Sequence, residues 1–314
     1  MEITFMHMGE CALAMEHFEK ALSLYDSEQH QNDPFRYVQK PGIAMRCFAA
    51  WTLWFLGRPD QALDRMHEAL VLARELSEPL ALAHTLFFAA ILHQLRREGR
   101  MAQERAEAAI AVSREHGLAL HHAHATITRG WVLIEQGRQE EAIEQMRQGL
   151  AAHQATGAKV LRPHFLALLA EALDKAHRGE QGLRVLEEAL AASHRTGERY
   201  YEAELYRLKG ELLLMRPASR SVSQAATGGK AMVGVQPTAI ADAAGCFNQA
   251  ILIARQQNAK SLELRAVMSV ARLYRNQGRP EEARSLLAEV YNRFCEGFDT
   301  TDLREAKGLL DALS

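Results

Sequence analysis

Histidine is the residue type in this chain best suited to chemistry, because its side chain titrates near neutral pH and ligates metals. Fourteen occur, and three of them, His84, His124 and His164, follow one another at intervals of forty residues. If each interval is one structural repeat, these imidazoles are about 10 Å apart, since packed helices are separated by 8–10 Å. A zinc–nitrogen bond is only about 2 Å long. We therefore expect no metal site and place these histidines at the surface or at the edge of a groove.

Other groups with catalytic potential have structural explanations. Adjacent glutamates such as Glu140 and Glu141 stand where a turn passes into a helix, a position that favours negative charge. The segment Gly228-Gly229-Lys230 is followed by Ala231, where a phosphate-binding loop requires serine or threonine. The chain contains neither Gly-x-Ser-x-Gly nor His-Glu-x-x-His. The sequence predicts no catalytic residue and no cofactor.

A column of large and charged side chains favours binding instead. Trp51, Ile91 and Trp131 are forty residues apart, and charged residues occupy equivalent positions further along the chain. Aromatic and arginine anchors suit recognition of a peptide or a partner helix. The residues of this predicted concave face are Trp51, Trp54, His84, Phe87, Ile91, His124, Ile127, Trp131, Ile134, Glu171, Arg207, Glu211, Arg272 and Arg275. We expect a groove with an apolar half and a charged half; packing inside a superhelix or against a preceding domain is the alternative.

The elements that carry these residues repeat with a period of about forty residues. Small residues recur at Ala62, Ala102 and Ala142, and a bulkier residue such as Met66 or Met146 stands four positions later. Small residues let two helix backbones approach, and the large residues between them fill the gaps. No helix pair buries its apolar face alone, so stacked pairs share one continuous core.

The pattern predicts an all-α chain that forms a single solenoid over 1–314. We expect a truncated first repeat at 1–26, a loop at 27–40, a flexible insertion within repeat six at 216–237 and a capping helix at 301–313. The other predicted helices cover 41–56, 59–76, 79–96, 100–116, 118–136, 139–155, 159–177, 180–195, 199–215, 238–257, 259–277 and 280–294.

Residues just past the helix ends support these boundaries. Gly117, Gly157 and Gly197 fall one repeat apart, where a left-handed backbone conformation is wanted. Ser77 and Asn258 take the same place in other repeats.

The columns of small, large and small residues resemble the tetratricopeptide repeat family, in a long form of about forty residues. This resemblance implies a right-handed α-solenoid of about six to seven helix pairs. Armadillo or HEAT repeats, which have a similar period, are the alternative.

The C-terminal run carries a second resemblance. It includes Gly278-Arg279, Glu296-Gly297-Phe298-Asp299-Thr300 and Ala306-Lys307, and it is similar to the end of large bacterial signalling proteins. In those proteins an adenylate/guanylate cyclase or kinase domain precedes an AAA-type ATPase and then tetratricopeptide repeats. The resemblance implies that this chain is the C-terminal piece of such a protein, with its catalytic domains upstream of Met1.

Composition limits the classes of partner. The net charge is −2 and no block of Lys or Arg exists, so we expect neither nucleic acid nor membrane as a partner. The most apolar run, Leu80 to Leu92, is too short to span a bilayer, and the N-terminus carries no secretory signal. Four widely spaced cysteines suit a reducing cytoplasm.

These observations predict a cytoplasmic, non-catalytic regulatory module. Its partner would be a protein or peptide segment, or its own missing N-terminal domains. A small-ligand or peptide sensor domain of a transcription regulator with tetratricopeptide repeats is the alternative. The sequence makes no prediction about oligomeric state.

Overall fold

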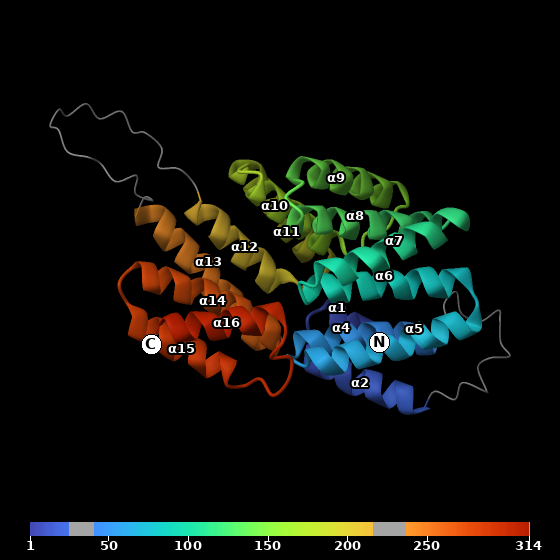
Figure 1. The fold of residues 1–314 in the computed structure, drawn as a ribbon, viewed down its shortest axis with the longest axis horizontal. Helices are drawn as coiled ribbons and strands as arrows, with labels where there is room; N and C mark the ends of the chain where they lie inside the picture. Colours follow the sequence, from blue (N-terminus) through green and yellow to red (C-terminus); the bar gives the residue numbers. More distant parts are fainter. Residues whose placement is uncertain (25–40, 216–236, 314) are drawn as a thin grey trace.

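The computed structural model describes residues 1–24, 41–215 and 237–313, and every regular element in these ranges is a helix (Figure 1). The helices are α1 (Glu2–His7), α2 (Cys11–Leu24), α4 (Pro41–Phe55), α5 (Pro59–Leu76), α6 (Pro79–Leu95), α7 (Gly99–Glu115), α8 (Ala119–Glu135), α9 (Gln139–Ala155), α10 (Arg162–Lys175), α11 (Gly179–Thr196), α12 (Glu202–Leu214), α13 (Pro237–Gln256), α14 (Lys260–Asn276), α15 (Pro280–Tyr291) and α16 (Thr301–Ala312). The predicted all-α solenoid is confirmed. The loop expected at 27–40 and, apart from its last residue, the insertion expected at 216–237 lie outside the described residues.

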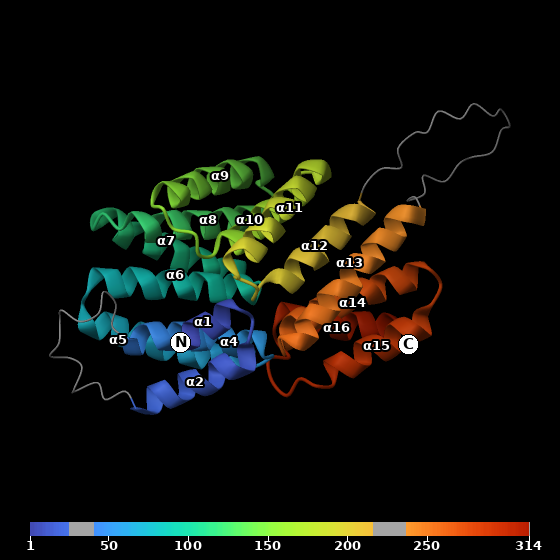
Figure 2. The same ribbon diagram turned by 180° about the vertical axis from the view of Figure 1, so that it is seen from behind.

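Consecutive helices pack as pairs, from α4 with α5 to α14 with α15, and the pairs stack into two layers. In the inner layer α4, α6, α8, α10, α12, α14 and α16 each contact the next helix of this series. The odd-numbered helices α5 to α15 form the outer layer (Figures 1 and 2).

Burial distinguishes the two layers. The inner helix α6 is buried on nearly all sides from Ala81 to Leu95, whereas the outer helix α5 buries a stripe that includes Ala62, Met66 and Ala69. A helix that is apolar all round must be covered all round, and an amphipathic helix needs cover on one face only. The interior of the solenoid is therefore built from the inner helices.

The predicted pairing of small and large residues is seen directly. A Cβ atom added to Gly130 of α8 would lie 2.7 Å from Cγ of Met146 in α9. One added to Gly210 of α12 would lie 2.7 Å from Cδ1 of the Phe247 ring in α13. Neither gap admits a methyl group without movement, so the glycines set the distance between paired helices.

The turns also follow the predicted chemistry. Ser77 and Asn258 have backbone φ angles of 53° and 54°, and Gly197 has a φ of 76°, so all three adopt the left-handed conformation expected after a helix. Thr300 precedes α16, and its hydroxyl donates a hydrogen bond of 2.6 Å to the carbonyl of Gly297 and does not cap the helix.

The solenoid closes on itself. Helix α14 contacts α4, and the Ser261 hydroxyl donates a hydrogen bond of 2.5 Å to the carbonyl of Trp54. The carboxylate of Glu296 accepts hydrogen bonds from the backbone N–H groups of Asp60 and Gln61 at the start of α5, at 2.9 and 3.1 Å. Figure 2 shows the resulting approach of the C-terminal helices to the N-terminal ones. The described residues include no helix with the length and apolarity needed to cross a bilayer.

Candidate functional site

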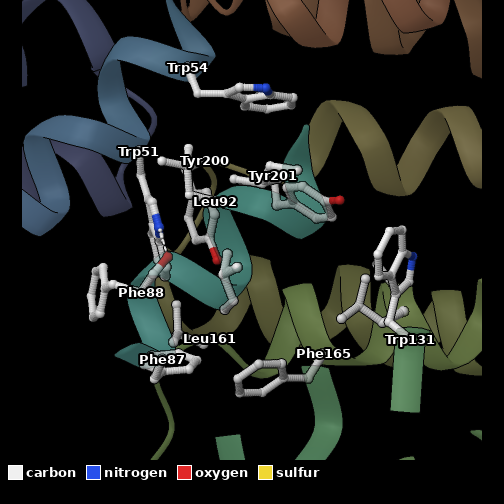
Figure 3. Close-up of a cluster of buried hydrophobic side chains, with 14 of the residues drawn as sticks. Trp51, Trp54, Phe87, Phe88, Leu92, Trp131, Leu161, Phe165, Tyr200 and Tyr201 are labelled. Atoms are coloured by element: carbon white, nitrogen blue, oxygen red, sulfur yellow. Dashed lines mark hydrogen bonds between the residues drawn. The ribbon is translucent and has the colours of Figure 1, made fainter. Parts of the chain in front are cut away.

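The apolar half of the predicted concave face lies in the core. Its members are all less than a tenth exposed: Trp51, Trp54, His84, Phe87, Ile91, His124, Ile127, Trp131 and Ile134. The Trp51 ring stacks on Phe88 with a centroid distance of 4.1 Å, and its indole N–H donates to the carbonyl of Phe88 at 2.9 Å. Figure 3 shows how these rings fill the interior. The expected open apolar groove is therefore absent from the described residues, and packing inside a superhelix describes these positions.

The expectation for the histidines also needs correction. His84, His124 and His164 are buried and do not lie at the surface or at a groove edge. Imidazoles of neighbouring repeats do meet, because Nε2 of His121, one turn before His124, lies 3.4 Å from Nδ1 of His84. The described residues contain no group of three or more side chains able to hold a metal ion.

Burial keeps these imidazoles neutral. It lowers the pKa of His84 to about 3, with a contribution from His121, and it lowers the pKa of His164 to about 3. Burial also lowers the pKa values of His121, His124 and His153. At neutral pH these rings are uncharged core residues.

Most of the charged half of the predicted face, together with Trp131 from the apolar half, lines a cavity of about 310 Å³, which we call the inner cavity. Five predicted residues line it: Trp131, Glu171, Arg207, Glu211 and Arg272. Arg275 is exposed and is not part of the lining. The inner helices α8, α10, α12, α14 and α16 provide most of its wall. Five of the residues that sequence register placed on one face therefore meet at one cavity.

Ion pairs within α12 and between α14 and α16 hold the wall in place. Arg207 donates to both carboxylate oxygens of Glu204, at 2.9 and 2.8 Å, and to Glu211 at 3.3 Å. Arg265 donates to Asp302 at 2.8 Å, and its guanidinium lies 5.0 Å from the centre of the Trp54 ring. Burial alone would raise the pKa of Glu204, but Arg207 and Arg265 outweigh it and lower that pKa. Glu204 is therefore an ionised, fully paired carboxylate.

The capping helix completes the wall. Arg272 of α14 donates to Glu305 at 3.1 Å, and Arg97, from the turn after α6, donates to Glu305 at 2.9 Å and to Asp302 at 3.3 Å. The sequence analysis missed Arg97, Asp302 and Glu305 because they reach the cavity only when the solenoid closes. The spacing of Asp302 and Glu305 on one face of a helix was the available signal.

Two carboxylates of α10 differ from the others. Glu171 accepts a hydrogen bond of 3.1 Å from the indole N–H of Trp131, and burial raises its pKa. Asp174 lies one turn further along the same face, and burial raises its pKa as well. The sequence analysis identified Glu171 and missed Asp174. The inner cavity therefore offers fixed charges and hydrogen-bonding groups that can bind a polar ligand.

Comparisons with known proteins agree with this architecture. Tetratricopeptide repeat models match residues 45–68, 123–148 and 264–296, which favours this repeat class over armadillo or HEAT. No curated protein matches the sequence significantly.

Several solved structures share the fold. A Rap protein complexed with competence and sporulation factor is 16% identical with a TM-score of 0.59, over 97% of this chain and 80% of that one. The apo form of RapI is 12% identical with a TM-score of 0.55, over 96% and 92%. Aspartyl phosphate phosphatase F from Bacillus subtilis is 14% identical with a TM-score of 0.53, over 93% and 67%. The chain therefore contains tetratricopeptide repeats and folds as the same kind of helical solenoid as these proteins.

Proposed function

We propose that this chain is a non-catalytic, regulatory interaction module that binds a polypeptide segment in the inner cavity. The observation that supports this most is the cavity itself. It lies on the inner helices, has a volume of about 310 Å³ and carries five residues of the predicted concave face. Most of its charged side chains are held by ion pairs, so a ligand meets groups that are already in position, which reduces the cost of binding.

The size of the cavity limits what enters it. Ligand pockets typically measure about 300–1,000 Å³, and the inner cavity lies at the lower end of this range. One long side chain or a few residues of an extended segment fit this volume, whereas a whole partner helix does not. The segment would come from another protein or from a domain that precedes the repeats.

The context we propose is a bacterial signalling protein. The resemblance of the C-terminal run to proteins with cyclase or kinase and ATPase domains supports this assignment. The Rap protein of similar fold was solved with a bound factor, which is a property of that protein and a precedent for the fold. With a net charge of −2, we expect this chain to bind neither nucleic acid nor anionic membranes. Its four widely spaced cysteines suit a reducing cytoplasm, where we expect it to act.

A small-ligand sensor is the second candidate function. The enclosure of the cavity by α16 favours it, because Asp302 and Glu305 cover the side that an open solenoid would leave free. A free small molecule that raises the melting temperature, when no peptide does so, would favour the sensor over the peptide-binding module.

The test uses the full chain and a displayed library of random peptides. Lys175 lines the cavity with an exposed side chain, so Lys175→Trp obstructs the cavity without disturbing the core. Arg184→Trp, on the exposed face of α11, is the matched control. We expect selected peptides to bind the wild type and the Arg184 variant and to lose affinity for the Lys175 variant. Equal binding to all three proteins would place the site elsewhere and reject the proposal.

A further inference from the structure

The inner cavity is lined by six carboxylates, four arginines and Lys175, and not all of these charges form ion pairs. Each of its four arginines, Arg97, Arg207, Arg265 and Arg272, donates a hydrogen bond to at least one carboxylate of Glu204, Glu211, Asp302 or Glu305. These arginines are therefore occupied by groups of the protein itself. An anionic ligand would have to compete with carboxylates that are already in position.

Two carboxylates lack such a partner. Within the described part of the chain, no Lys, Arg or His nitrogen lies within 4.0 Å of a carboxylate oxygen of Glu171 or Asp174. Glu171 has one neutral donor, the indole N–H of Trp131 at 3.1 Å. Both residues line the cavity from the same face of α10, one helical turn apart.

The surroundings make these two negative charges costly. Burial raises the pKa of each, and the charges of Glu204 near Glu171 and of Glu211 near Asp174 act in the same direction. The charge of Arg207 opposes this at Glu171, and the charge of Lys175 is the main one that opposes it at Asp174, yet both pKa values remain raised. A buried carboxylate is stable as an ion only when a cation or several hydrogen bonds compensate for lost hydration. A positive group bound in the cavity could contact both carboxylates directly, which Lys175 and Arg207 do not do.

We propose that the ligand of the inner cavity presents a cationic nitrogen group, an ammonium or a guanidinium, that binds between Glu171 and Asp174. This inference rests on the proposed binding function and adds the chemical class of the ligand. A lysine or arginine side chain of a bound segment carries such a group, and so does a free alkyl diamine. A metal ion is a poor occupant, because no group of three or more metal-ligating side chains occurs among the described residues.

The test measures binding to acetylated pentapeptides that are alanine except at the centre. The central residue is lysine, arginine, glutamate or an uncharged analogue, norleucine or citrulline. A second arm uses 1,5-diaminopentane at the same ionic strength. Calorimetry gives the Kd for the full-length wild type, for Glu171→Gln and Asp174→Asn, and for the control Glu187→Gln on the exposed face of α11.

We expect the lysine or arginine peptide to bind the wild type and the Glu187 variant. The Kd should rise about tenfold to a hundredfold in the Glu171 and Asp174 variants, the range for loss of a charged hydrogen-bond partner. Glu171→Gln keeps an oxygen for the Trp131 indole, so its unliganded melting temperature should equal or exceed that of the wild type. A fall in melting temperature together with unchanged Kd would show a structural role and overturn the proposal.

The remaining outcomes separate this inference from the proposed function. Equal binding of the neutral, acidic and basic peptides would overturn the cationic class while leaving peptide binding intact. Binding of the diamine without any basic peptide would support the cationic class and favour the sensor over the peptide-binding module. If neither peptides nor diamine bind, the cationic class is rejected, and library peptides blocked by Lys175→Trp would still support the proposed function.

Discussion

At the scale of single residues, the most unusual feature is the set of buried imidazoles. His84, His121, His124, His153 and His164 lie in the core, and neither ring nitrogen of His124 has a hydrogen-bond partner in the described part of the chain. Burial lowers all five pKa values. These five imidazoles therefore resist protonation in the folded protein. In the unfolded chain they accept a proton near the ordinary histidine pKa of about 6.5.

This difference predicts that acid destabilises the fold. Because the folded pKa of His164 is about 3, its contribution to stability is complete above pH 6.5 and is lost as the pH falls from 6.5 towards 3. Between pH 7.5 and 5.5, His164 should account for a loss of about 1.4 kcal/mol in the free energy of unfolding. In urea unfolding, the free energy of unfolding of His164→Gln should fall between pH 7.5 and 5.5 by about 1.4 kcal/mol less than that of the wild type.

The exposed His67 supplies the control. His67→Gln should retain the wild-type pH dependence, since this side chain stays in contact with water when the chain folds. If the His164 variant retains it as well, folding does not lower the pKa of this ring, and the account of the buried imidazole is wrong.

Sequence register placed several residues of the predicted concave face at the inner cavity, but it did not predict that the apolar members of that face, such as Trp51, are buried in the core. The repeat period alone places five of them on the corresponding faces of successive inner helices: Trp131, Glu171, Arg207, Glu211 and Arg272. Whether Trp51 faces a groove or a core depends on how tightly the solenoid curves. That curvature is a sum of small rotations between repeats, which no local pattern specifies.

At the scale of helices, the distance between partners is set by small residues. Gly210 of α12 faces the Phe247 ring of α13 with no room for a methyl group. Helix boundaries were predicted to within about three residues for most elements, because a turn and a small-residue column recur in each repeat.

Alanine substitutions in adjacent helices test the role of the small column. Gly210→Ala should destabilise the protein by about 1–3 kcal/mol, because overpacking outweighs the gain of about 1 kcal/mol in helix propensity. Gly245→Ala in α13 has open space around its Cβ position and should stabilise by about 0.5–1 kcal/mol. Thermal or urea unfolding measures both changes.

A lower free energy of unfolding for Gly210→Ala and a higher one for Gly245→Ala would confirm that contact with Phe247 sets the distance between α12 and α13. A stabilising Gly210→Ala would show that α12 and α13 can separate at little cost, contrary to the close packing of the pair.

At the scale of the whole molecule, the chain forms a closed solenoid. Residues more than two hundred positions apart meet, as in the hydrogen bonds from Asp60 and Gln61 to Glu296 and the ion pair between Arg97 and Asp302. Negative charge at the start of α5 is favourable, so Glu296 acts as a cap from a distant repeat. The sequence analysis did not predict this closure, because both contacts depend on the pitch of the entire superhelix.

Two glycines with similar backbones test the closing contact. Gly297 has a φ of 74°, and a Cβ there would collide with Pro59; Gly278 has a φ of 76° and open space. Alanine at either site costs about 1–2 kcal/mol for the left-handed conformation. Only Gly297→Ala should also open the solenoid, increase the radius of gyration in X-ray scattering and shift tryptophan emission to the red as Trp54 becomes exposed.

Unchanged scattering and emission in the Gly297 variant, with a loss of stability equal to that of Gly278→Ala, would contradict closure. In that case the contacts between the C-terminal segment and α5 would not hold the two ends of the solenoid together in solution.

Photo-crosslinking tests most directly whether the inner cavity is the binding site. A library-selected peptide that carries a diazirine is bound to the full chain, irradiated, and the attachment sites are identified by mass spectrometry. Binding in the inner cavity predicts attachment to α10 and α12, around Asp174, Lys175, Leu208 and Met215, and loss of these products in Lys175→Trp. Attachment confined to the outer helices α5, α7, α9 and α11 would contradict a binding site inside the closed solenoid.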